Sequence, residues 1–463
     1  MRVTLRMTQT DHGVLQRHLF PGDGKEAVAI ALCGRRRSLT RPGLMVHRIV
    51  PIPHNECSVR RPDLVTWPTD RLVPLLADAA QRDLAILKIH SHPGGYEQFS
   101  DTDDISDAAL YNSVFGWTES DYPHASTVML PGGRIFGRAV VPDGSFLPLH
   151  SVVVAGDDIS YWPSAVPGSV PAFSQRHAQL FGSATTQTLR NMSIAVVGCS
   201  GTGGPLVEML ARLGVGRLVL IDPDHVELKN LNRIPNTTME DAFLKRPKVE
   251  ALARAIAAMG LGTEVEIYHC DLATPEAVQA VAECDVVFGC MDGIEGRHLL
   301  NRLATYYLLP YFDLGVRLDA DGLGGIANAA AAIHYLRPDG STLKDRGVYS
   351  AEELQADGLR RTDPAAYRQQ VRVGYIHGVR EDRPAVVSIN TQVASTAVNE
   401  FLARLHPYRL DTNADSAIVR INFVQAYTSR EHEPEPSGMF TKVAGRGDID
   451  PLLSMPVLGG GPA

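Results

Sequence analysis

The chain has 463 residues, 44% of them hydrophobic and 21% charged, which is the composition of a globular protein with room for two or three domains. Its net charge of −8, without a block of Lys and Arg, argues against a nucleic-acid partner. No apolar run reaches membrane-spanning length, no signal-peptide core opens the sequence, and the six cysteines show no repeated Cys-x-x-Cys spacing, so we expect a cytoplasmic protein.

The first region, residues 1–155, is expected to be an α+β domain. Residues 24–34 form an apolar segment headed by Glu26, which predicts a buried strand. The run 84–89 predicts a second strand that continues through His92, and residues 104–110 show a helical pattern. Residues 156–172 hold several Pro, Gly and Ser and are interpreted as a linker.

The second region, residues 173–430, alternates predicted strands with predicted helices. This order indicates an α/β domain with a Rossmann-like, mainly parallel sheet. From residue 431 the sequence is rich in Pro and Gly, so we expect residues 431–463 to be a mobile tail or an extended arm. The expected strands are 194–197, 217–221, 265–269 and 285–290, and the expected helices are 205–213, 248–259 and 391–404.

A possible metal-binding motif lies in the first region. His90 and His92 are two residues apart on the predicted strand, so their side chains point to one face, and Ser100 and Asp103 follow. Two imidazoles and one carboxylate leave a fourth tetrahedral position for water, as in catalytic zinc sites. Zinc lowers the pKa of such a water molecule. The alternative is a polar loop with surface histidines.

This motif resembles the JAMM family, also called JAB or MPN+, whose members cleave peptide or isopeptide bonds after ubiquitin-like proteins. The resemblance covers residues 1–150. It implies zinc ligands at His90, His92 and Asp103, a general base at Glu26 and an oxyanion-side hydroxyl at Ser100. Glu56 is a competing candidate for the base, which we rank lower because Pro51, Pro53 and Asn55 place it in a loop.

A second motif follows the strand predicted at 194–197. Residues 198–204 form a glycine-rich turn before a helix, where backbone N–H groups can hold phosphates. Asp222 ends the next predicted strand, where a carboxylate can bind ribose. These two features alone also fit an NAD-dependent dehydrogenase. Arg233, Lys248 and Asp292 instead favour a nucleoside triphosphate with Mg²⁺, because cations offset phosphate charge and carboxylates bind Mg²⁺.

The second motif, with Asn-Leu-Asn-Arg at 230–233, resembles the ThiF/MoeB adenylyltransferases, relatives of ubiquitin-activating enzymes. The resemblance covers residues 170–430 and implies ATP as cofactor and a homodimer in which Arg176 reaches the partner's nucleotide. Asp292 is followed by Gly293 where that family usually has Asn. The implied roles are a phosphate loop at Gly198, Gly201 and Gly203, ribose binding at Asp222, phosphate contacts at Asn230, Arg233 and Lys248, and Mg²⁺ binding at Asp292.

The cysteines depart from the pattern of thioester-forming activating enzymes, which carry a reactive Cys after the Mg²⁺ aspartate. No cysteine follows Cys290 in this sequence, and thioester chemistry needs a thiol. We therefore expect the reaction to stop at the acyl-adenylate, or the acyl group to pass directly to a nucleophile on a partner.

Together the two resemblances predict a bifunctional enzyme like those of bacterial ubiquitin-like conjugation systems and their antiphage relatives. It would process a ubiquitin-like protein ending in glycine and adenylate it, alongside a partner that resembles a conjugating enzyme. The alternatives are activation of a sulfur-carrier protein or small peptide with an accessory protease domain, and a non-catalytic scaffold.

Overall fold

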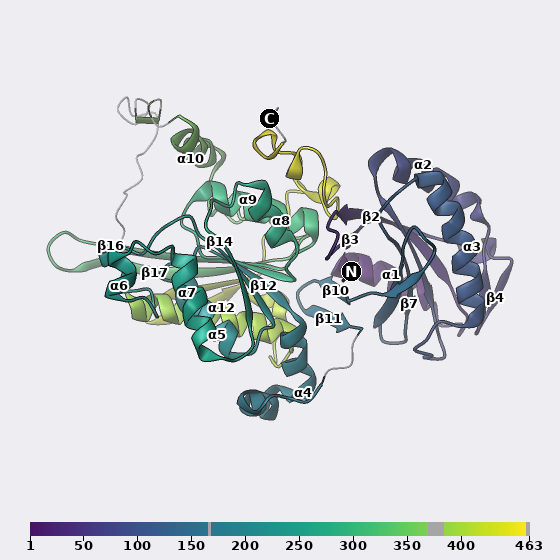
Figure 1. Ribbon diagram of the computed structural model, residues 1–463, viewed down its shortest axis with the longest axis horizontal. Helices are drawn as coiled ribbons and strands as arrows, with labels where there is room; N and C mark the ends of the chain where they lie inside the picture. Colours follow the sequence, from purple (N-terminus) through teal and green to yellow (C-terminus); the bar gives the residue numbers. More distant parts are fainter. Residues whose placement is uncertain (165–167, 364, 366, 369–383, 460–463) are drawn as a thin grey trace. The chain divides into compact units, whose positions relative to one another are not determined.

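The computed structural model describes residues 1–164, 168–363, 365, 367–368 and 384–459. The chain divides into two compact units (Figure 1). The first unit comprises Met1–Pro167, Thr305–Leu308 and Thr441–Ala463, and the second comprises Gly168–Ala304 and Leu309–Phe440. Residues 165–167 of the predicted linker and 460–463 of the predicted tail lie outside the described residues. Within the described ranges, no helix combines the length and apolarity needed to cross a membrane.

The first unit is built on a nine-stranded mixed sheet with the order β11-β10-β1-β3-β2-β6-β7-β8-β9. Its central strands are buried along their whole length, as expected for a sheet covered on both faces. The strands are β1 (Thr4–Thr8), β2 (Val28–Arg36), β3 (Gly43–Pro51), β6 (Ala85–Ser91), β7 (His124–Met129), β8 (Ile135–Val140), β9 (Phe146–Pro148), β10 (Ser151–Ala155) and β11 (Ile159–Pro163). A separate small hairpin joins β4 (Val59–Arg61) to β5 (Leu64–Thr66).

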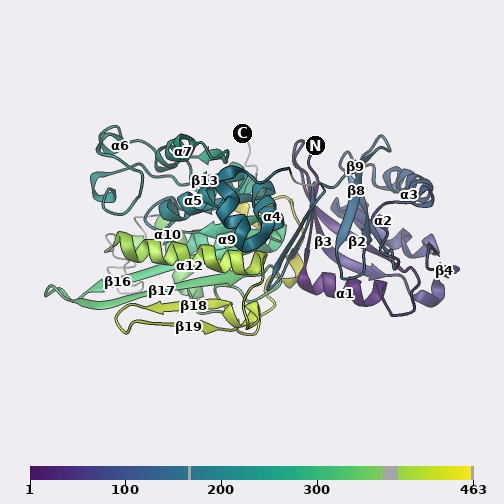
Figure 2. The same cartoon turned by 90° about the horizontal axis from the view of Figure 1, so that it is seen from below.

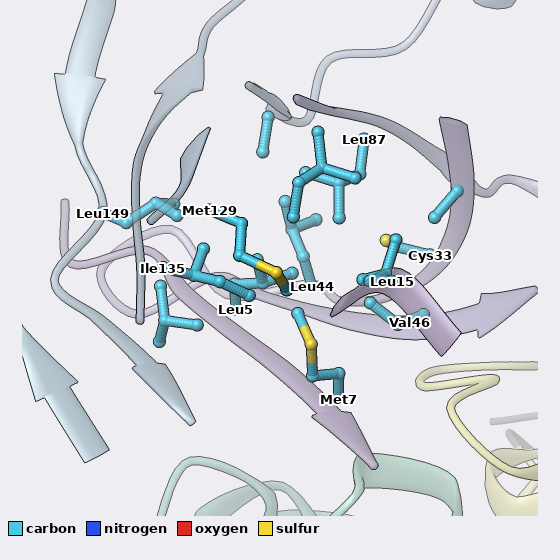
Figure 3. Packing of buried hydrophobic residues seen from close by; sticks show 14 of the residues in the cluster. Leu5, Met7, Leu15, Cys33, Leu44, Val46, Leu87, Met129, Ile135 and Leu149 are labelled. Carbon is cyan, nitrogen blue, oxygen red and sulfur yellow. The ribbon is translucent and has the colours of Figure 1, made fainter. Parts of the chain in front are cut away.

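Alternating side chains of the central strands form two hydrophobic cores. In β2, Ala29 and Ala31 join the core that includes Leu15 and Leu19 of α1 (Gln9–Leu19), shown in Figure 3. Ile30, between them, joins the other core, formed with α2 (Val73–Arg82) and α3 (Asp101–Thr118). The predicted helix at 104–110 lies within the longer α3, which contributes Tyr111 and Val114 to this second core.

A buried ion cluster ties α3 to the sheet. Asp107 of α3 is fully buried, and its two carboxylate oxygens lie 2.6 Å from Lys88 Nζ of β6 and 2.7 Å from Arg138 Nη2 of β8. Arg138 also pairs with Asp104, which is half exposed.

Replacing Asp107 with Ala should lower the free energy of unfolding by about 3–5 kcal/mol, because Lys88 and Arg138 would keep buried charges without that carboxylate. Asp104→Asn removes an exposed partner of the same arginine and should cost less than about 1 kcal/mol. Urea unfolding of both variants measures the difference. Equal losses would show that the buried cluster contributes no more than the exposed pair.

The first unit extends beyond the predicted boundary at residue 155, because β10 and β11 form a hairpin within its sheet. It also includes the C-terminal segment, which we predicted to be a mobile tail or an extended arm. Glu431 instead ends a strand of the second unit, and residues 441–458 hold three short 3₁₀ helices, Thr441–Val443, Leu452–Ser454 and Pro456–Leu458.

Backbone contacts hold this C-terminal segment against β2 and β3. Gly34 N donates to Gly445 O at 3.1 Å, and Asp448 N donates to Arg35 O at 2.6 Å. A Cβ at Gly34 would lie 2.2 Å from the Arg446 carbonyl carbon, so glycine is required for the close approach. The composition of residues 431–463 did not predict this docking, because backbone pairing leaves no hydrophobic pattern.

The second unit contains an eight-stranded sheet with the order β14-β13-β12-β15-β16-β17-β18-β19. β14 to β16 are parallel, whereas β16 to β19 are antiparallel. The parallel part was predicted and the antiparallel extension was not. The strands are β12 (Ser193–Val197), β13 (Arg217–Ile221), β14 (Glu264–Tyr268), β15 (Val286–Gly289), β16 (Tyr311–Ala320), β17 (Ile326–Leu336), β18 (Ile418–Asn422) and β19 (Tyr427–Glu431).

The strand order of this unit has a switch point at β12. β12 has β13 on one side and β15 on the other, and both pairs are parallel, so the order in which strands are added to the sheet reverses at β12. Ligands commonly bind at such switch points in open α/β sheets. α12 packs against α5, β16 and β17, as Figure 2 shows. The helices are α4 (Gln175–Asn191), α5 (Gly203–Arg212), α6 (Met239–Phe243), α7 (Lys248–Met259), α8 (Pro275–Ala282), α9 (Ile294–Tyr307), α10 (Ala351–Thr362) and α12 (Val387–Leu405).

Candidate functional sites

The first candidate site lies where β6 ends and α3 begins. His90 is in β6, His92 follows its last residue, and Asp103 is in the first turn of α3. Ser100 caps this helix: its Oγ accepts a hydrogen bond from Asp103 N at 3.2 Å, and Asp103 Oδ2 accepts from Ser100 N at 2.9 Å and Oγ at 2.7 Å. This capping box holds the Asp103 carboxylate beside the histidines.

The three predicted zinc ligands converge. His90 Nε2 lies 3.1 Å from Asp103 Oδ1 and 3.1 Å from His92 Nε2, and His92 Nε2 lies 3.7 Å from Asp103 Oδ2. Their donor atoms all fall within 4.8 Å of one another. Two imidazole nitrogens and one carboxylate oxygen are a donor set that fits zinc. His92 Nδ1 lies 2.8 Å from Tyr96 O, which favours the tautomer with Nε2 free for a metal.

Burial and hydrogen bonding act in different ways on the pKa values of the three triad residues. Burial opposes ionisation of Asp103, but its hydrogen bonds with His90 and His92 outweigh that effect and hold its pKa below the ordinary value. Burial lowers the pKa of His90. At His92 burial acts in the same direction, but the Asp103 hydrogen bond prevails and raises the pKa. The triad therefore combines a carboxylate with imidazoles in a largely buried place.

The structure separates the two candidates for the general base. Glu26 Oε1 lies 4.0 Å from His92 Nε2, and burial raises the pKa of Glu26 to about 7. Glu56 instead pairs with Arg71, whose hydrogen bond lowers the pKa of Glu56. Of the two candidates, Glu26 is the one that lies beside a triad histidine, and its role as the base remains a prediction. The oxyanion role of Ser100 remains a prediction, because in the structure its hydroxyl donates to Asp103.

The second candidate site lies at the switch point of the second unit. Gly198 has φ +92°, and a Cβ there would lie 2.8 Å from the Cys290 carbonyl carbon at the end of β15. A Cβ at Gly203 would lie 1.9 Å from Gly198 O, so the loop can close this tightly only with glycine. At Gly201 a Cβ would meet the Asn390 side chain at 2.3 Å.

Asp222 connects this loop to the lysine predicted to contact phosphate. Its Oδ2 accepts from Cys199 N at 2.7 Å, and its Oδ1 accepts from Asp224 N at 2.9 Å. Lys248 Nζ at the start of α7 lies 2.6 Å from Asp224 Oδ2 and 3.7 Å from Asp222 Oδ1. Burial raises the pKa of Asp222. The site thus holds a buried cation beside a glycine-rich loop, an arrangement suited to a phosphate chain.

The remaining predicted residues differ in how they relate to this loop. Asn230 is buried, and its Oδ1 accepts from Glu227 N at 3.0 Å, so it caps the 3₁₀ helix Leu228–Asn230. Arg233 has its Cδ 3.4 Å from the Cβ position of Gly201, beside the loop. Asp292 is exposed in the segment after β15, and Arg176 is exposed at the start of α4.

Asn390 of α12 is a candidate site residue that sequence reasoning missed. It is 5% exposed and its amide faces Gly201. The helix was predicted from residue 391, and a single polar residue at a helix start carries no signal of the loop that it meets. Asp357 of α10 was also missed: its Oδ2 accepts from Glu295 N at 2.9 Å, close to Gly293.

Two cysteines near this site have thiols whose pKa is raised. Burial raises the pKa of Cys199 well above the ordinary value and that of Cys290 to about 12. Reactive cysteines have a lowered pKa, which neither thiol shows; Cys199 is buried and Cys290 is partly buried.

The family model for the ThiF family matches residues 174–438, more than half of the chain. The chain belongs to the ThiF family. The match covers the glycine loop, Asp222, Lys248 and Asp292, and it agrees with the predicted Rossmann-like α/β fold of the second unit.

Curated relatives of this ThiF-family chain include activating enzymes. It is 39% identical over 114 residues to the adenylyltransferase and sulfurtransferase MOCS3 of Danio rerio, covering 24% of each chain. It is 30% identical over 164 residues to the ubiquitin-like modifier-activating enzyme 5 of Drosophila mojavensis, covering 33% of this chain and 38% of that one. The matches thus span well under half the length of these relatives.

A crystal structure of E. coli MccB with MccA-N7isoAsn is similar at 16% identity and a TM-score of 0.46, covering 58% of this chain and 74% of that chain.

Proposed function

We propose that the second unit adenylates the C-terminal glycine of a ubiquitin-like protein with ATP. A carboxylate oxygen of the glycine attacks the α-phosphorus of ATP, an acyl–phosphate bond forms, and pyrophosphate leaves. The observation that supports this proposal is the position of Lys248, whose buried Nζ lies 2.6 Å from Asp224 beside the glycine loop at the switch point. Such a cation offsets the charge that develops as pyrophosphate leaves.

Other residues take the roles that the family resemblance implies. Asp222 would bind the ribose, the N–H groups of the loop with Gly198, Gly201 and Gly203 would hold phosphates, and Asp292 would hold Mg²⁺. Arg233 lies beside Gly201 and would contact the phosphates directly, whereas Asn230 would act by shaping the segment before Arg233. Arg176 would act across a homodimer, which agrees with its exposed position on α4.

The names of the relatives leave two classes of substrate open. A ubiquitin-like modifier would pass to a partner resembling a conjugating enzyme, whereas a sulfur carrier or small peptide would be activated for another use. A non-catalytic scaffold is disfavoured because the lysine and both aspartates of the loop region are in place.

A binding experiment distinguishes adenylation from a dehydrogenase. Isothermal titration should detect binding of ATP, and tight binding of NADH without binding of ATP would contradict the proposal.

We also propose that the first unit is a JAMM-like zinc peptidase that cleaves peptide or isopeptide bonds after a ubiquitin-like protein. Support comes from the convergence of His90, His92 and Asp103 within 4.8 Å. When bound, zinc would supply Lewis-acid activation of a carbonyl and of water. Glu26 would take a proton from water and deliver one to the leaving amine. The Ser100 hydroxyl, which donates to Asp103 in the structure, would turn to donate to the developing oxyanion, while Ser100 N keeps its hydrogen bond to Asp103.

The two activities suit one substrate, because cleavage frees the glycine carboxylate that adenylation uses. This order agrees with the resemblance to bacterial ubiquitin-like conjugation systems and their antiphage relatives.

Adenylate formation should survive removal of the thiols. A variant with all six cysteines changed to Ala should keep pyrophosphate exchange within about tenfold of the unchanged chain, with some loss of stability from the buried sites. Denaturing gels with and without reductant should show no reducible adduct with the ubiquitin-like protein. A reductant-sensitive band that one Cys→Ala variant abolishes would overturn transfer without a thioester and identify the carrier.

A further inference from the structure

A cavity of about 490 Å³ in the first unit lies next to the histidine triad. Its wall includes Phe99, on the segment between His92 and Ser100, and Phe136 of β8. The Phe136 ring lies 5.5 Å from that of Phe99 and 6.4 Å from that of His92, so one aromatic side chain borders both the triad and the cavity. An extended peptide advances about 3.3 Å per residue, so the separation of the His92 and Phe136 rings corresponds to about two residues of such a peptide.

Several of the residues that line the cavity are apolar. Leu149 and Val152 are buried at 1% and 2% exposure, and Trp162 of β11 stands beside them. The edge strand β9 contributes Phe146 and Pro148. The cavity falls in the size range of ligand pockets, with room for a bulky side chain and the peptide backbone next to it.

The charged residues of the wall are already paired. Arg138 is bound by Asp104 and Asp107, and its guanidinium lies 3.8 Å from the Phe99 ring centre and 3.9 Å from that of Phe146. Arg134 Nη1 lies 2.9 Å from Glu97 Oε2 at the rim. A charged ligand group would therefore have to displace an existing ion pair, whereas an apolar side chain would displace only water.

We propose that this cavity is a specificity pocket for a bulky apolar side chain, of the leucine or phenylalanine class, within about two residues of the bond cleaved at the triad. The inference rests on the proposed peptidase function of the first unit. It adds that the substrate is selected by an apolar residue near the scissile bond as well as by a folded ubiquitin-like body.

Binding can be measured without catalysis. The full chain, labelled with 5-fluorotryptophan, gives ¹⁹F signals from its three tryptophans, which Trp→Phe variants assign. N-acetyl-leucyl-glycine amide should shift the Trp162 signal at concentrations where N-acetyl-glycyl-glycine amide does not, and the signal of Trp117, exposed on α3, should stay unchanged. An equal Trp162 response to both peptides, or none up to the solubility limit, would overturn the pocket.

Cleavage gives the second readout. The zinc-loaded full chain is incubated with a proteome-derived peptide library, and cleavage sites are identified by mass spectrometry. Leu, Phe or Met should be enriched at one position within two residues of the cut. Trp162→Ala should reduce that preference by about tenfold, and Trp162→Leu less, because discrimination by an apolar pocket follows the area that it buries. Trp117→Ala is the matched control and should leave the preference unchanged.

The outcomes separate the two proposals. Absence of any zinc-dependent cleavage, with a selective Trp162 shift, would reject the peptidase and retain an apolar binding pocket. Zinc-dependent cleavage without an apolar preference would reject the pocket and retain the peptidase. The same conclusion would follow if both Trp162 variants kept the apolar preference, provided that they also retained zinc and thermal stability.

Discussion

Lys248→Ala should lower ATP–pyrophosphate exchange by about 100-fold or more. Lys248 Nζ lies 2.6 Å from Asp224 and 3.7 Å from Asp222 after β13, where in the proposed function it would contact the phosphates of ATP held by the loop 198–204. Loss of one main electrostatic contact to a developing charge typically costs this much. Arg233→Ala and Asp292→Ala should show losses of the same order. Exchange is measured with the full chain and a ubiquitin-like protein ending in glycine.

The matched control is Lys229→Ala. Lys229 is an exposed lysine of the same region, and its Nζ lies 3.4 Å from Glu227. Its removal should leave exchange within about twofold, because solvent screens exposed charges. If Lys248→Ala and Lys229→Ala lower exchange equally, the assignment of Lys248 to the phosphates is wrong.

Glu26→Gln should strongly slow cleavage by the first unit while leaving zinc bound. The change removes the proton-accepting group 4.0 Å from His92 and keeps the size of the side chain. General acid–base groups contribute about 10²–10⁴-fold to a rate, so kcat should fall in that range. His92→Ala should instead lose the metal, because it removes a ligand. Zinc content by elemental analysis, together with cleavage of a fusion to a ubiquitin-like protein, separates the two effects.

Glu56→Gln is the control for this pair. Glu56 is the competing base in the sequence, and it pairs with Arg71 away from the triad. It should retain full cleavage and full zinc content. If Glu56→Gln lost cleavage and Glu26→Gln kept it, Glu56 rather than Glu26 would be the base. Unchanged zinc content in His92→Ala would show that His92 is not a zinc ligand.

Local patterns were enough to predict the elements that carry both sites. The strand Arg217–Ile221 and the helix Lys248–Met259 agree with the prediction residue for residue, because each has an uninterrupted hydrophobic pattern with a clear end. The spacing from His90 to Asp103 predicted their convergence, since a strand end and a capped helix start are both local features.

Features that depend on distant parts of the chain were not predictable in this way. Asn390 meets Gly201 only because α12 packs against α5. The segment around Gly445 docks through backbone hydrogen bonds to β2 and through glycines at the close approach, and neither feature leaves a hydrophobic pattern in the sequence. The antiparallel strands β17 to β19 extend a sheet whose parallel half shows the more familiar alternation of strand and helix.

The central claim is that one chain both trims and adenylates the same ubiquitin-like protein, and intact-mass analysis of that protein tests it most directly. The substrate is the small protein that co-purifies with the chain, extended by a few residues beyond its glycine. With zinc alone it should be cut after the glycine. With ATP and Mg²⁺ added, the trimmed form should become an adenylate that hydroxylamine converts to a hydroxamate. Glu26→Gln should prevent both the trimmed protein and its hydroxamate from appearing, whereas Lys248→Ala should prevent only the hydroxamate. A hydroxamate formed without trimming, or trimming that Glu26→Gln leaves intact, would contradict the account.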